Sequence, residues 1–164
     1  MPDVTLQQLY QDLQDPLGLE ALTPLPEQPV PVVAQDVHRP GMAVMGFTEN
    51  FLTERIQIMG ESEMSYLATL DDRAQVEAIG RVLSLQPPTI LITRGLPVPE
   101  AVLGHARELG YPILRSVRSA VTVSNELQRY LERAFAPRCE VHGTLVDVYG
   151  VGLLFTGRSG IGKS

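Results

Sequence analysis

The chain has 164 residues, 44% hydrophobic and 20% charged, which suffices for a domain whose core needs no disulfide or metal. Its net charge of −6, with 13 scattered Lys and Arg residues, argues against nucleic-acid binding. The single cysteine, Cys139, excludes an internal disulfide, and no segment is apolar enough for a signal peptide or a membrane span. We therefore expect a cytoplasmic protein without a membrane partner.

The first part of the chain predicts a helix and an extended connector. A capping box begins at Thr5, and apolar residues recur at helical spacing until Pro16 and Gly18 are expected to end the helix. Four prolines in residues 23–31 exclude another helix and lead toward a strand expected near residues 32–34.

Strands and helices then alternate up to Phe135. The strands are expected near residues 55–58, 89–93 and 113–114, and the helices near 61–68, 71–83, 99–110 and from Ser119 or Ser124 to 135. This alternation predicts a three-layer α/β/α domain over residues 1–135, with a largely parallel or mixed sheet.

A second domain is expected to begin after Phe135. Ala136-Pro137-Arg138 interrupts the last helix, and residues 140–148, a Tyr149-Gly150 turn and residues 151–156 predict a β-hairpin. We therefore assign residues 136–164 to the opening of a P-loop domain.

A phosphate-binding loop follows this hairpin directly. Its residues match G-x-x-x-x-G-K-[ST] at every fixed position: Gly157, Arg158, Ser159, Gly160, Ile161, Gly162, Lys163 and Ser164. Glycines let backbone N–H groups surround a phosphate, the lysine reaches the β- and γ-phosphates, and the serine hydroxyl holds Mg²⁺. The alternative is a glycine-rich turn without a ligand. The chain ends before the helix that a P-loop normally opens, which indicates a chain cut within a nucleotide site.

Two polar residues of the hairpin are candidates for the same site. His142 lies on the first strand, and a hairpin that folds back brings it toward the loop, where it can donate to phosphate or transfer a proton. A structural or surface histidine is the alternative. Asp147, two residues before the turn, is either a nucleotide or metal ligand or a hydrogen-bond acceptor at the hairpin end.

Two arginines of the first domain stand beside glycines at expected strand ends. They occur in Arg39-Pro40-Gly41 and in Thr93-Arg94-Gly95. Open α/β sheets bind ligands at the carboxyl ends of their strands, so an anionic ligand near Arg94 is one interpretation. Ordinary turn chemistry with a solvated arginine is the other interpretation, and we favour it.

Residues 142–152, which run toward the P-loop, closely resemble the active-site region of bacterial HPr kinase/phosphorylase. Earlier segments agree in the same order, namely residues 39–41, 54–60 and 88–96, so the resemblance spans about Val32 to Ser164.

The resemblance implies a bifunctional enzyme that acts on the phosphocarrier protein HPr. Such enzymes transfer phosphate from ATP or pyrophosphate to a serine of HPr and remove it by phosphorolysis, which links carbon-source use to metabolic state. It implies that Gly157 to Ser164 bind ATP, that Lys163 stabilises the transferring charge, that Ser164 ligates Mg²⁺ and that His142 is catalytic. It also implies a hexamer.

The family's general base and a further Mg²⁺ ligand lie downstream of the P-loop, beyond residue 164. Because positioning and electrostatics carry nearly all of phosphoryl-transfer catalysis, we expect residues 1–164 alone to be inactive. The alternative is a freestanding N-terminal binding or assembly module with a residual P-loop.

Overall fold

The computed structural model describes residues 4–137 and 143–156. Five strands form one mixed sheet in the order β1-β5-β4-β3-β2, and two further strands form the separate pair β6-β7. The strands of the larger sheet are β1 (Leu19–Ala21), β2 (Val37–His38), β3 (Ile56–Met59), β4 (Ile90–Ile92) and β5 (Ile113–Ser116). Strands β2 to β5 are parallel to one another, and β1 adds to β5 in the antiparallel direction.

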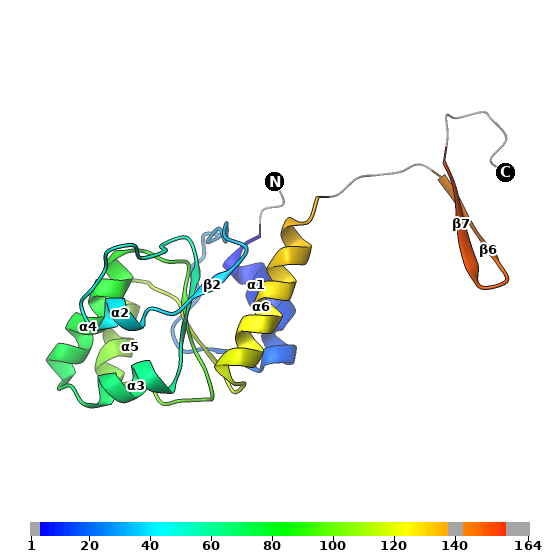
Figure 1. The fold of residues 1–164 in the computed structure, drawn as a ribbon. Helices are drawn as coiled ribbons and strands as arrows, with labels where there is room; N and C mark the ends of the chain where they lie inside the picture. Colours follow the sequence, from blue (N-terminus) through cyan, green and yellow to red (C-terminus); the bar gives the residue numbers. More distant parts are fainter. Residues whose placement is uncertain (1–3, 138–142, 157–164) are drawn as a thin grey trace.

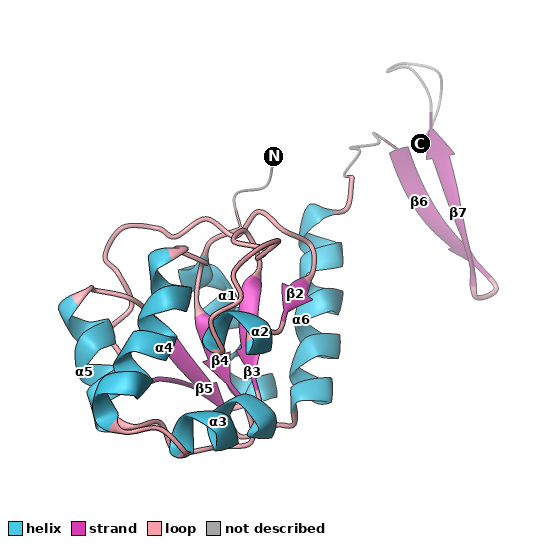
Figure 2. Ribbon diagram, turned by 60° about the vertical axis from the view of Figure 1, so that its left-hand side comes forward, coloured by secondary structure: helices cyan, strands magenta, loops and turns pink. Residues whose placement is uncertain are grey.

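Six helices cover this sheet in the described residues (Figure 1). They are α1 (Leu6–Leu17), α2 (Gly41–Val44), α3 (Glu61–Ala68), α4 (Asp72–Ser84), α5 (Glu100–Glu108) and α6 (Ala120–Phe135). In Figure 2, α1 and α6 lie on one side of the sheet, and α3, α4 and α5 lie on the other.

Two separate apolar cores confirm the predicted three-layer α/β/α arrangement. Met59, Ile90 and Ile92 pack with residues of α2 to α5, whereas Ile58 and Leu91 pack with residues of α1 and α6. Successive strand residues point to opposite faces, so β3, β4 and β5 each supply residues to both cores. The sheet is therefore buried on both sides, as parallel sheets usually are.

The strand predicted near residues 55–58 is present, but its polar residue does not face solvent. All four residues of β3 are buried, and the Gln57 side chain is fully buried. Its amide nitrogen donates to the carbonyls of Leu52 and Arg55, and its oxygen contacts His38 Nδ1 at 2.9 Å. Hydrogen bonds thus satisfy the polar side chain that this buried strand carries.

The prediction of a strand near residues 32–34 is wrong. Val32 is buried and its N–H donates to the Val4 carbonyl, but only an isolated bridge between Thr5 and Pro31 forms here. Prolines supply no N–H groups for a continuous ladder, so the parallel edge strand forms later, as β2. The short edge strand β1 has no counterpart in the predicted elements.

The helix ends follow the sequence signals with one exception. Asp71 caps α4 and Ser119, rather than Ser124, caps α6, each by accepting a hydrogen bond from a backbone N–H. The exception is Pro16, which lies inside the last turn of α1 instead of ending it. Gly18 ends that helix in the left-handed conformation, as expected.

Candidate functional site

The predicted nucleotide-binding residues Gly157–Ser164 lie outside the described residues, as do His142 and Cys139. The strands beside them are described: β6 (Gly143–Val148) pairs antiparallel with β7 (Val151–Thr156). Gly143 lies opposite Thr156 in this register. The strand that follows His142 and the strand that precedes the P-loop therefore meet at the same end of the hairpin.

Close backbone contact at that end depends on Gly143. A Cβ atom added there would lie 2.7 Å from the Phe155 carbonyl oxygen, which is too close for an unshifted side chain. At the opposite end, Tyr149 and Gly150 both have positive φ, as a type I′ turn requires. Asp147 accepts a hydrogen bond from the Gly150 N–H at 2.9 Å. The structure thus supports the turn-forming interpretation of Asp147.

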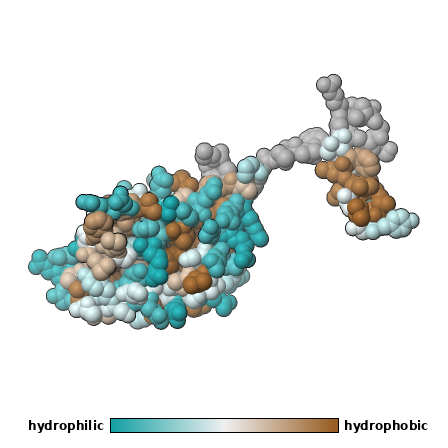
Figure 3. All heavy atoms as spheres, in the orientation of Figure 1, coloured by the Kyte–Doolittle hydropathy of each residue, from teal (hydrophilic) through white to brown (hydrophobic). Residues whose placement is uncertain are grey.

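Both strands of the hairpin are exposed along their whole length. Figure 3 shows this hairpin as a largely hydrophobic surface. Its exposed apolar side chains include Leu145, Val146, Leu153, Leu154 and Phe155. Apolar residues on both faces of a strand pair are typical of strands that are buried within a larger sheet.

The other predicted candidates, Arg39 and Arg94, come together at one edge of the large sheet. Arg39 follows β2 and Arg94 lies two residues after β4, and these strands flank β3. Because β2, β3 and β4 are parallel, all three carboxyl ends meet at this edge. Each arginine is more than half exposed and forms an ion pair with a glutamate of α3.

The stronger of these ion pairs involves a buried carboxylate. Glu63 is 7% exposed, and its Oε2 accepts from the Arg39 guanidinium at 2.9 Å and from the Gly60 N–H at 2.9 Å. Burial by itself raises the pKa of Glu63, but these hydrogen bonds and the positive charge outweigh burial, so its pKa lies below the ordinary value. Sequence reasoning missed Glu63, although a glutamate three residues after Gly60 is a capping signal.

The arginine of the second ion pair, Arg94, belongs to a turn with positive φ angles. Arg94 Nη1 is 3.4 Å from Glu61 Oε1, and both side chains are more than half exposed. Arg94 and Gly95 both have positive φ, and their N–H groups donate to the carbonyls of Arg118 and Ser116. The turn after β4 is therefore held against the chain that follows β5.

Acidic and histidine side chains do not gather into a metal site within residues 4–137 and 143–156. His38 instead packs edge-on against Phe51, with 5.6 Å between the ring centroids. Of the helices described, none is long and apolar enough to cross a membrane.

Comparison with protein families decides where this fold belongs. Residues 4–131 match the family described as HPr Serine kinase N terminus. The chain belongs to this family. Residues 133–164 match the HPr Serine kinase C-terminal domain.

Curated relatives of the HPr serine kinase family are 40% identical to the chain. One is an HPr kinase/phosphorylase of Alkaliphilus metalliredigens (strain QYMF), aligned over the whole chain and 52% of the relative. Another is an HPr kinase/phosphorylase of Bacillus mycoides (strain KBAB4), aligned over 82% of the chain and 43% of the relative. The chain spans about half the length of these relatives.

A solved structure shares the α/β fold over much of the chain. It contains the CBS and DRTGG domains of the regulatory region of Clostridium perfringens pyrophosphatase, complexed with the activator diadenosine tetraphosphate. The match has a TM-score of 0.52 at 16% identity and covers 72% of the chain and 45% of that structure. At this identity the likeness establishes the α/β fold alone.

Proposed function

We propose that the protein to which residues 1–164 belong is an ATP-dependent HPr kinase/phosphorylase. The observation that carries this proposal is that the family match continues through residues 133–164, across the complete P-loop pattern. The names of the relatives agree with it. A freestanding binding module with a residual P-loop has less support, because the C-terminal match begins two residues after the N-terminal match ends.

The P-loop residues suit a nucleotide with Mg²⁺. Gly157, Gly160 and Gly162 provide backbone N–H groups without side chains, Lys163 provides a positive charge and Ser164 provides a hydroxyl ligand for the metal. Lys163 is the only lysine in the sequence. Bound ATP with Mg²⁺ supplies the phosphoryl group and neutralises charge during its transfer.

His142 is proposed to act on the same phosphates. The register that pairs Gly143 with Thr156 supports this, because His142 and Gly157 directly adjoin these two residues in sequence. An imidazole there can donate a hydrogen bond to phosphate or transfer a proton to or from the attacking group. We further propose that residues 1–135 and 136–164 belong to different domains, and that the complete protein is cytoplasmic and hexameric.

The decisive experiment is phosphorylation of HPr with ATP and Mg²⁺. It compares residues 1–164 with a protein extended to the length of the curated relatives, in wild-type and Lys163→Ala forms. We expect transfer only by the extended protein, and a loss of roughly 100-fold or more in Lys163→Ala because one strong electrostatic contact to the transferring group is removed. Arg73→Ala, at an exposed position on α4, is the matched control and should retain activity.

ATP binding separates the possible failures of this test. If the extended protein binds ATP but leaves HPr unmodified, the substrate assignment is wrong and another P-loop enzyme is indicated. If it binds no ATP, the nucleotide assignment itself is wrong.

A further inference from the structure

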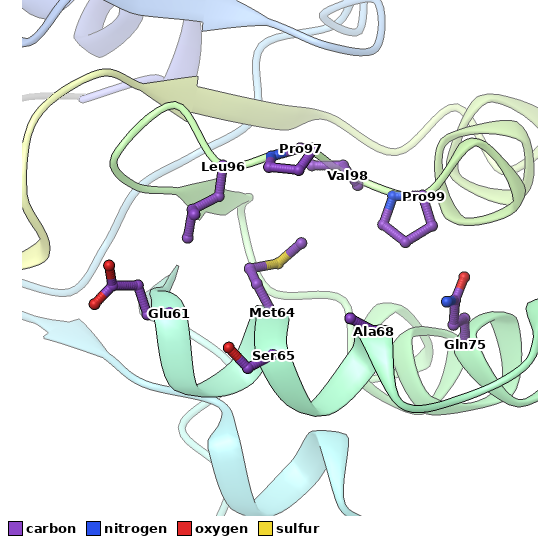
Figure 4. Close-up of a pocket in the computed structure, with 9 residues that line it drawn as sticks. All are labelled: Glu61, Met64, Ser65, Ala68, Gln75, Leu96, Pro97, Val98 and Pro99. Carbon is purple, nitrogen blue, oxygen red and sulfur yellow. The ribbon is translucent and has the colours of Figure 1, made fainter.

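Two cavities at the carboxyl edge of the large sheet differ in their charged groups. The larger lies between α3 and the loop that leads from β4 to α5, and Figure 4 shows the residues that line it. Most of these are apolar, and among the described residues that line it only Glu61 is charged. The smaller cavity, of about 290 Å³, lies beside the end of β2 and is lined by charges of both signs, Arg39 and Glu49. The smaller cavity is therefore the more selective of the two.

Three segments of the chain form this smaller cavity. Its lining residues come from the end of β2, from α2 and from the loop after α2, and they include His38, Arg39, Met42, Phe47, Glu49 and Phe51. Two contacts attach the loop to the sheet. Gln57 of β3 donates to the Leu52 carbonyl at 3.0 Å, and the His38 ring packs edge-on against Phe51. The cavity is thus formed without a ligand, which lowers the cost of binding one.

The orientation of His38 leaves its second ring nitrogen available. Gln57 Nε2 donates to the carbonyls of Leu52 and Arg55 at 3.0 and 2.8 Å. The Gln57 atom that lies 2.9 Å from His38 Nδ1 is therefore the amide oxygen, and Nδ1 must donate to it. In a neutral ring Nε2 is then an acceptor, and it points away from Gln57 because the two ring nitrogens diverge. Within residues 4–137 and 143–156, only Nδ1 of this ring forms a hydrogen bond.

Arg39 and Glu49 line the same cavity with opposite charges. The Arg39 side chain is 55% exposed, and within the described residues only its Nη2 forms an ion pair, with Glu63. Other N–H groups of the guanidinium remain for a ligand. Glu49 is exposed, and in the described part of the chain Arg39 pairs with Glu63 and not with Glu49. A ligand that carries both a negative and a positive charge can therefore bridge the two.

The rest of the cavity wall is mainly apolar. Met42 and Phe47 are exposed and Phe51 is partly buried, so an apolar group in the cavity covers surface that otherwise meets water. The volume lies just below the range of about 300–1,000 Å³ that is common for small-molecule sites, so the ligand must be small. An amino acid with an apolar side chain has this size, both charges and the apolar group.

We propose that this cavity binds a free amino acid with an apolar side chain. Its carboxylate contacts Arg39, its ammonium group contacts Glu49 and donates to His38 Nε2, and its side chain packs against the apolar wall. The cavity lies outside the carboxyl end of a parallel strand, which is where open α/β sheets bind ligands. The site belongs to the N-terminal part of the chain and is separate from the proposed nucleotide site.

The test is an NMR titration of the 164-residue chain with L-phenylalanine, observed at the methionine methyl signals. Met42 and Met45 are both 60% exposed, but only Met42 lines this cavity. We expect a saturable shift of the Met42 signal and little change at Met45. Two analogues are compared: hydrocinnamate lacks the ammonium group, and phenethylamine lacks the carboxylate. Each should bind about tenfold more weakly, because each loses one charge-assisted contact.

Two glutamates of the same loop provide matched variants. Glu49 and Glu54 are both exposed, but only Glu49 lines this cavity. Glu49→Gln should weaken phenylalanine binding about tenfold and leave hydrocinnamate binding no weaker, so the preference for phenylalanine disappears. Glu54→Gln should retain that preference. Both variants should fold, because each changes an exposed side chain.

Three results would overturn the proposal. They are the lack of a saturable Met42 shift that exceeds the one at Met45, an analogue that binds as tightly as phenylalanine, and unchanged phenylalanine binding in Glu49→Gln. Equally tight hydrocinnamate would indicate a site for carboxylates alone, and equally tight phenethylamine a site for cations alone. None of these results bears on HPr phosphorylation, so this proposal and the proposed kinase activity can fail independently.

Discussion

The Arg39 guanidinium donates to the Glu63 carboxylate at 2.9 Å and thereby joins the end of β2 to the first turn of α3. The same carboxylate oxygen accepts from the Gly60 N–H, which immediately follows β3. One buried side chain thus holds together two adjacent strand ends and a helix. Because that edge is a candidate ligand-binding edge, the charge of Glu63 matters for its geometry.

Stability should decrease in acid because of Glu63. Its pKa is lowered in the folded state, since hydrogen bonds from Gly60 and Arg39 outweigh the opposing effect of burial. A lowered folded-state pKa gives stabilisation that is complete above the unfolded pKa and is lost as the pH falls through the folded pKa. Urea unfolding from pH 7 down through the carboxyl range, below about pH 5, should reveal this loss.

Glu63→Gln tests the same contact directly. We expect the free energy of unfolding at pH 7 to fall by about 1–3 kcal/mol, because a charge-assisted hydrogen bond is lost in a buried place, and the acid dependence to become weaker. Glu61→Gln is the control, since Glu61 is 61% exposed, and it should change stability by less than about 0.5 kcal/mol. Equal effects of the two variants would contradict the structural role of Glu63.

The ends of α4 and α5 give a prediction about backbone strain. Each helix is followed by a residue with positive φ, Gln86 at 54° after α4 and Gly110 at 62° after α5. Glycine adopts this conformation without the Cβ clash that glutamine has. Gln86→Gly should therefore raise the free energy of unfolding by about 0.5–1 kcal/mol, and Gly110→Ala should lower it by about 1 kcal/mol.

Gly104 provides the control for that pair. It lies inside α5, and a Cβ added there meets nothing within 4 Å. Gly104→Ala should stabilise the helix by about 0.5–1 kcal/mol. If both glycine-to-alanine variants changed thermal stability in the same direction, the left-handed conformation of Gly110 would not be the cause.

A buried threonine should contribute strongly to the attachment of β5. Thr23 is 2% exposed, and its hydroxyl donates to the Tyr111 carbonyl and accepts from the Ile113 N–H, both at 2.7 Å. Thr23→Val keeps the shape but leaves both backbone groups unpaired, so we expect a loss of about 2 kcal/mol in urea unfolding. Thr53→Val, at an exposed position, should stay within about 0.5 kcal/mol of the wild type.

The proposed role of His142 predicts a defect in transfer rather than in nucleotide binding. In the extended protein, His142→Ala should lower the rate of HPr phosphorylation by roughly 10²–10⁴-fold, the contribution of a positioned acid or base. ATP affinity should remain close to that of the wild type. A variant that phosphorylates HPr normally would assign His142 a structural role, and Arg73→Ala, at an exposed position on α4, serves as the comparison.

The sequence predicted elements best where local signals and burial agree. Asp71, Pro99 and Ser119 each directly precede a helix in the structure. The helical spacing of apolar residues predicted these three helices. The strand at residues 32–34 was mispredicted, and the strand at Leu19–Ala21 was missed. Short edge strands are hard to predict because pairing with a distant neighbour, here β5 for β1, determines whether they form.

The P-loop pattern and the order of the family segments were fully contained in the sequence, because phosphate binding requires particular residue types at fixed local spacing. The tertiary structure alone decided that Arg39 and Arg94 lie at one edge, each paired with a glutamate of α3. It alone buried the Gln75 side chain, whose amide nitrogen donates to the carbonyls of Leu67 and Leu70. Such contacts depend on how helices and strands pack, and packing distances are not encoded in any local spacing.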